Sequence, residues 1–210
     1  MKKLTQFINE RLLKLSDHKS KETIRTTVTP KDKDELKKII EDTIKKEGNE
    51  CDLNFIDVSN VKNMHYVFAN SMFNGDISGW DVSEVEDMGG MFLNSTFNGD
   101  ISGWDVSKVA NMYGMFLNSD FTGDISNWDV SKVVNMYGMF TNTKFNGDIS
   151  NWDVSNVRNM AYMFKDSMFN GDLSNWYMPK LLLSNNMFSP QLKKKYYVDI
   201  DKKTKRFVKK

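Results

Sequence analysis

Residues 73–83 have the sequence FNGDISGWDVS, and the same eleven letters return with few changes along the chain. Further copies begin at Phe97 and Phe145, another begins at Phe121 with threonine as its second residue, and a decayed copy begins at Phe169. The starts are therefore 24 residues apart each time. A constant period in this range is typical of repeat proteins, in which each unit buries its apolar side by stacking on its neighbours.

Each unit has the apolar spacing of a leucine-rich repeat. The positions of the pattern L-x-x-L-x-L-x-x-[N/C] are filled by Ile77, Trp80, Val82 and, in the last slot, Val85. Trp80 and Val82 are two residues apart, which predicts a short strand, and residues 85–92 have helical spacing. We therefore expect an α/β repeat fold: a leucine-rich-repeat-like solenoid of about six 24-residue turns, each with a short parallel strand and a short helix.

The segments on either side of the repeats have their own patterns. Residues 2–15 have an apolar face at helical spacing, and a second helix is expected to begin with Thr29 as its N-cap and Pro30 as its first residue. That second helix would cover the open end of the first turn, as the caps of repeat proteins do. We divide the chain into an amphipathic helix (1–16), a linker (17–28), a capping helix (29–48), the repeat solenoid (49–190) and a basic C-terminal hairpin or tail (191–210).

The net charge of +1 conceals an uneven distribution. Residues 49–190 have 7 basic and 17 acidic side chains, whereas residues 191–210 have 9 basic and 2 acidic ones. We expect the acidic solenoid to repel nucleic acid, because binding to phosphates requires clustered lysine and arginine. No apolar stretch is long enough for a membrane span, and polar residues interrupt the N-terminus where a signal peptide would be apolar. With Cys51 as the single cysteine, no intrachain disulfide is possible.

Tryptophan and methionine recur at fixed positions of the repeat. The tryptophans are Trp80, Trp104, Trp128, Trp152 and Trp176, and the methionines include Met88, Met112, Met136 and Met160. Such a row of indoles could form a binding surface, and methionine-rich surfaces bind partner helices. We favour core packing for both, because the tryptophan position corresponds to an inward leucine of the leucine-rich pattern and Ile56 fills it in the first unit.

Two columns of aspartate run through the repeats. One contains Asp76, Asp100, Asp124 and Asp148, and the other contains Asp57, Asp81, Asp105, Asp129 and Asp153. Stacked carboxylates repel one another unless they are neutralised. Calcium between the turns is one solution, with Asp76, Asp100, Asp124 and Asp148 as its ligands. We favour the other solution, in which each carboxylate accepts hydrogen bonds from backbone N–H groups, and we assign no cofactor.

The repeat resembles the bacterial surface protein repeat of the BspA-like leucine-rich-repeat family. The residues that match are 103–116, GWDVSKVANMYGMF, followed by the FNxDIS element, and the similarity extends over about residues 50–190. The resemblance implies a leucine-rich-repeat-like fold that acts in adhesion or protein recognition, and it implies no catalytic residues. Many relatives have a secretion signal that this chain lacks, which favours a phage-encoded member.

We expect a non-enzymatic module that binds a protein or glycan partner. Since the units are nearly identical, specificity should depend on the positions where they differ, and we predict Tyr113, Tyr137 and Tyr162 as exposed partner contacts. Two alternatives remain: a structural component of a phage virion or cell envelope that docks through residues 1–15, and, more remotely, a carbohydrate-active enzyme that uses paired carboxylates. The expected location is cytoplasmic or virion-associated, and the resemblance adds the cell surface as an alternative.

Overall fold

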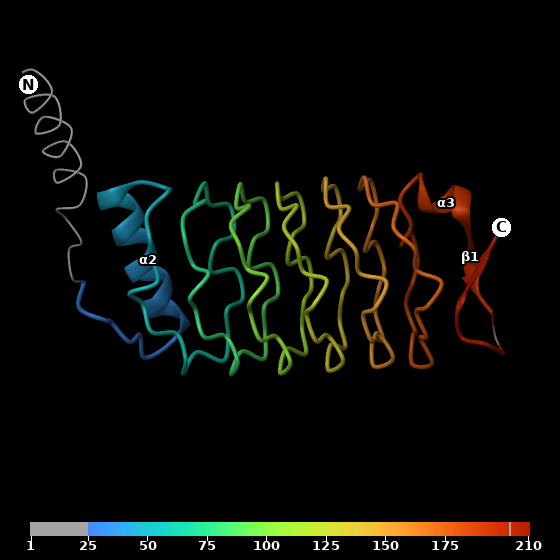
Figure 1. Ribbon diagram of the computed structural model, residues 1–210, viewed down its shortest axis with the longest axis horizontal. Coiled ribbons are helices and arrows are strands. Elements are labelled where there is room, and N and C mark those ends of the chain that lie inside the picture. The colour runs from blue at the N-terminus through green and yellow to red at the C-terminus, as the bar shows by residue number, and fades with distance from the viewer. Residues whose placement is uncertain (1–24, 202) are drawn as a thin grey trace, which may run out of the picture.

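The repeated units lie side by side along the long axis of the molecule in a computed structural model (Figure 1). The structure describes residues 25–201 and 203–210, so the expected helix 1–16 and most of the expected linker lie outside the described residues. The regular elements are α2 (Lys33–Glu47), α3 (Leu192–Lys195), β1 (Tyr196–Ile200) and β2 (Phe207–Lys209). No described helix has the length and apolar character needed to cross a membrane.

Neighbouring units are joined by isolated parallel bridges and not by the regular strands expected from the leucine-rich pattern. One series of bridges links Asn63, Asp87, Asn111, Asn135, Asn159 and Leu183 in turn. We call this series the bridge ladder. It lies several residues after the predicted strand, in which the Trp80 N–H bonds within its own unit to the carbonyl oxygen of Ile77, at 3.1 Å.

The expected short helix in each unit is replaced by turns. The N–H groups of Met88, Gly90 and Phe92 donate to carbonyl oxygens of the next unit at 2.6–2.9 Å, so they are unavailable for helical bonds. Gly90 (φ 60°) and Asn94 (φ 52°) are also left-handed, a conformation that ends an α-helix. The helical spacing of the methionine and phenylalanine residues therefore arises from tight turns that all point their apolar side chains inward.

The core consists of columns of identical side chains, which confirms the core assignment of tryptophan and methionine. All five tryptophans of the repeats are at most 4% exposed, and the methionines at the position of Met88 are fully buried. Each indole N–H donates to a backbone carbonyl of the preceding unit at 3.0–3.2 Å, as Trp128 does to Ile101. Phenylalanine rings stack alongside, with Phe92 and Phe116 centroids 5.7 Å apart.

The N-terminal end of the stack is covered by α2, with Leu36 and Ile40 buried. The helix begins at Lys33 with Asp32 as its N-cap, so the predicted start at Thr29 is wrong. The reason is that the preceding residues are extended and pair with the first unit: Val28 forms a parallel bridge with Ile56. In the same stretch, the Thr29 hydroxyl donates to Asp57 at 3.2 Å.

The C-terminal end has α3 and an antiparallel pair of strands, β1 and β2. The Tyr196 hydroxyl donates to Asp172 at 2.6 Å and accepts from the Leu173 N–H at 2.9 Å. Burial, together with the bond to Asp172, raises the pKa of Tyr196 to about 12. Tyr196 and Phe207 pack on each other and on Phe188, so the hairpin is anchored to the last unit by an aromatic cluster.

Replacing a central tryptophan should destabilise the whole stack. Trp128→Ala removes a ring that is 4% exposed together with its hydrogen bond to Ile101. We expect the free energy of unfolding to fall by about 3–5 kcal/mol, the usual cost of deleting a buried large aromatic side chain. Denaturant unfolding followed by circular dichroism measures the change, with Asp120→Ala, an exposed position, as the control. Equal stability of the two variants would contradict the core role of the indole.

Candidate interaction surface

The three predicted tyrosines form a continuous row across successive units. The ring centroids of Tyr113 and Tyr137 are 5.2 Å apart with the rings stacked, and those of Tyr137 and Tyr162 are 5.3 Å apart with the rings tilted by 51°. We call Tyr113, Tyr137 and Tyr162 the tyrosine row. All three are half-buried and not exposed as expected, because each ring covers part of its neighbour.

The row includes two different positions of the repeat. Tyr113 and Tyr137 are equivalent residues, whereas Tyr162 occupies the next position, which is left-handed with φ 61°. Glycine fills that position in the two preceding units, as Gly114 (φ 53°) and Gly138 (φ 60°). A tyrosine in the left-handed region is uncommon and costs conformational energy. The side chain of Tyr162 is thus placed beside Tyr137 at a local cost that glycine would avoid.

A second aromatic pair, His65 and Tyr66, occupies the same two repeat positions in the first unit. It was not predicted from the sequence. The His65 and Tyr66 ring centroids are 4.0 Å apart, and Tyr66 is 37% exposed with φ 62°. Gly89 and Gly90 of the next unit leave the space that these rings occupy, since a Cβ on Gly90 would lie 2.0 Å from the Tyr66 ring. The signal was available in the alignment of the units, where Tyr66 and Tyr162 share one position.

The chemistry of the tyrosine row suits recognition. Among the residues that the structure describes, no hydrogen bond is formed by the hydroxyl groups of Tyr113, Tyr137 and Tyr162, and the Lys165 ammonium lies 5.8 Å from the Tyr162 ring centroid. A half-buried tyrosine offers an apolar ring face and a hydroxyl that is free to donate or accept. The backbone beneath is held by bonds between units, so the rings lose little freedom when a partner binds.

The carboxylates of both aspartate columns accept hydrogen bonds from groups in their own turns. Asp76, Asp100, Asp124 and Asp148 each accept from the N–H of the serine two residues later, at 2.9 Å. The backbone N–H and the hydroxyl of that serine hold the pKa of these carboxyl groups below the usual 3.8. The column that contains Asp81 has the same arrangement. Within residues 25–201 and 203–210, no three potential metal-ligating side chains of Asp, Glu, His or Cys come together.

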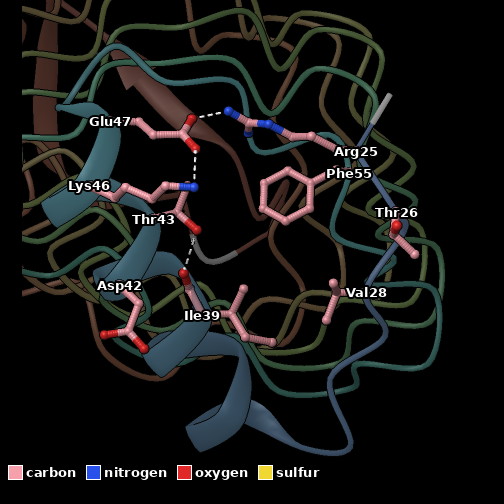
Figure 2. Close-up of a pocket in the computed structure, with 9 residues that line it drawn as sticks. All are labelled: Arg25, Thr26, Val28, Ile39, Asp42, Thr43, Lys46, Glu47 and Phe55. Carbon is pink, nitrogen blue, oxygen red and sulfur yellow. Dashed lines mark hydrogen bonds and ion pairs between the residues drawn. The ribbon is translucent and has the colours of Figure 1, made fainter. Parts of the chain in front are cut away.

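A cleft of about 650 Å³ separates α2 from the first unit (Figure 2). Ile39 and Val28 form apolar parts of its wall, and the Arg25 guanidinium lies 4.8 Å from the centroid of the Phe55 ring. Arg25 also forms an ion pair with Glu47 across the cleft. Arg25, Lys46 and Glu47 of the lining are already paired with one another, so these groups are less available to a ligand than the hydroxyl groups of the tyrosine row.

Comparison with known proteins relates most of the chain to one protein family. The family model described as "Mycoplasma protein of unknown function, DUF285" matches residues 35–143 and 97–202, which together include most of α2, all the repeats and the start of the C-terminal hairpin. The chain belongs to this family. No curated protein and no solved structure gives a significant match.

The aspartate hydrogen bonds should make the stack sensitive to acid. Carboxyl groups whose pKa is lower in the folded state bind fewer protons there than in the unfolded chain, so the free energy of unfolding should decline as the pH falls through and below about 4. In the triple variant Asp100→Asn, Asp124→Asn, Asp148→Asn, the amide oxygen can still accept from the serine N–H. We expect a flatter dependence on pH in urea unfolding between neutral and acid pH. An unchanged slope would show that these carboxylates do not contribute.

Calcium should leave the thermal stability unchanged. The carboxylate oxygens already accept protein hydrogen bonds, and calcium needs six to eight oxygen ligands. We expect the same melting temperature in millimolar calcium and in chelator. A rise with calcium that the triple aspartate variant abolishes would instead establish the aspartate column as a calcium site.

Proposed function

We propose that this chain is a non-enzymatic binding module that recognises a protein or glycan partner through the tyrosine row. The observation that carries the proposal is the contiguous contact of the Tyr113, Tyr137 and Tyr162 rings, with their hydroxyl groups free of bonds to other described residues. Tyrosine is enriched at protein interfaces because it combines a large rigid ring with a polar end. The same combination suits a sugar, whose apolar face packs on a ring while its hydroxyl groups bond to the phenol.

We further propose that the stacked units form a leucine-rich-repeat-like solenoid of the BspA-like type, acting in adhesion. The inter-unit bridges at a constant 24-residue interval support a solenoid. The match of residues 103–116 to the bacterial surface protein repeat supports the BspA-like assignment. In this proposal the aspartates and tryptophans maintain the stack, because their hydrogen bonds recur from unit to unit, and binding depends on the tyrosine row.

Removing the rings should abolish recognition without unfolding the protein. The triple variant Tyr113→Ala, Tyr137→Ala, Tyr162→Ala keeps every inter-unit backbone bond, since these bonds involve only the main chain at the three positions. Native and variant proteins are compared on a glycan array and in pull-downs from bacterial cell-surface extracts. We expect each ligand of the native protein to bind the variant at least about tenfold more weakly, as for loss of central aromatic contacts.

The matched control is Lys132→Ala, an exposed side chain in the same unit as Tyr137. It should bind like the native protein, and circular dichroism should show that all three proteins are folded. Equal binding by the triple variant would overturn the assignment of the tyrosine row. Absence of any ligand in both assays would overturn the binding function itself.

A further inference from the structure

The bridge ladder has a fixed hydrogen-bond pattern between units. In the first two units, the carbonyl oxygen of Lys62 accepts from the N–H groups of Glu86 and Asp87, at 2.8 and 3.3 Å. In return, the Met64 N–H donates to the carbonyl oxygen of Asp87 at 2.8 Å, and the Tyr66 N–H donates to the next unit at 3.0 Å. These three groups, one acceptor and two donors, face the unit that follows, and two further donors lie beyond them, the N–H groups of Phe68 and Asn70.

At Leu183 this ladder ends, with its three groups still present. The last bridge joins Asn159 to Leu183. The carbonyl oxygen of Leu182 and the N–H groups of Ser184 and Asn186 are the equivalents of the groups that pair in every earlier unit. Among the described residues, none of these three groups has a hydrogen-bond partner. We call Leu182–Asn186 the open edge.

The C-terminal cap, formed by α3, β1 and β2, leaves the open edge uncovered because it packs on residues 172–178, an earlier part of the last unit. The cap bonds to Met178, through the carbonyl of Lys205 at 2.9 Å, and to Asn175, through Arg206 at 2.6 Å. By contrast, Leu182 is 76% exposed and Leu183 is 51% exposed. Two adjacent exposed leucines beside unpaired backbone groups are the features of a surface that binds another chain.

The charges around the open edge are basic. Lys180 is exposed two residues before Leu182, and its ammonium donates to Asn156 at 2.6 Å. Arg158 is exposed in the preceding unit and forms no ion pair within the described part of the chain. Between the second and third units, the position of Lys180 forms an ion pair, Lys108 with Glu84. An acidic residue in the next strand would find the same kind of partner in Lys180.

We propose that the open edge binds an extended acidic segment of a partner protein as one more parallel rung of the bridge ladder. Two N–H groups of the segment donate to the Leu182 carbonyl, and its carbonyl oxygens accept from the Ser184 and Asn186 N–H groups. A carboxylate faces Lys180, and a large apolar residue two positions later covers Leu182. This is strand addition, in which main-chain bonds provide affinity and alternate side chains provide specificity. It is independent of the tyrosine row.

The chain itself supplies the template for a probe. Residues 83–92 form the rung that pairs with the first unit, so a labelled peptide of that sequence with Glu86→Leu places Glu84 opposite Lys180 and leucine opposite Leu182. Binding to the whole protein is measured by fluorescence anisotropy. We expect saturable binding that weakens at least about tenfold when the peptide N–H groups of residues 86 and 87 are methylated.

Charge reversal provides the sharper test. Lys180→Glu should weaken the probe at least about tenfold, and a second peptide with Glu84→Lys should bind this variant better than it binds the native protein. Tyr137→Ala should bind the probe normally, which separates this site from the tyrosine row. Absence of binding, or binding unaffected by backbone methylation and Lys180→Glu, overturns the proposal. Self-association of the native protein through the open edge, detected by sedimentation and abolished by Leu182→Asp, also overturns it.

Discussion

The bond from each indole N–H to a carbonyl of the preceding unit is the constraint on which the rest of the structure depends. It fixes the register, because a shift of one residue would leave both groups buried without their partners, at a cost of kilocalories per mole. Once the register is fixed, identical side chains stand beside one another along the stack. Phenylalanine then stacks on phenylalanine, and the hydrogen bond from serine to aspartate recurs in successive units at 2.9 Å.

Because so many positions serve this register, little of each unit is free to vary. The variable positions gather in the segment after the second aspartate, where Tyr113 and Leu182 lie in different units. The tyrosine row and the open edge therefore lie on the same part of the repeat. The tyrosine row runs across successive units, and the open edge is formed by the last unit. The C-terminal cap covers a different part of the last unit, with bonds to Met178 and Asn175.

The period and the core could be predicted from the sequence, whereas the position of the ladder could not. Trp128 and Met136 recur every 24 residues together with other apolar residues. Side chains of this size at a fixed repeat position are expected in the core, and they are buried there. The ladder lies at Asn111 and its equivalents, whose polar side chains give no strand pattern. Tyr66 was missed because its environment depends on the space left by Gly90, a relation between units that the sequence of one unit does not contain.

The indole bonds also give the stack a direction. Every tryptophan of the repeats donates to the unit before it and none to the unit after it, and the first one, Trp80, bonds to Leu53 of the first unit. A ribosome releases the chain in the same order. Each newly made unit therefore meets an indole acceptor that is already in place, a geometry that favours the addition of units one by one onto a folded template.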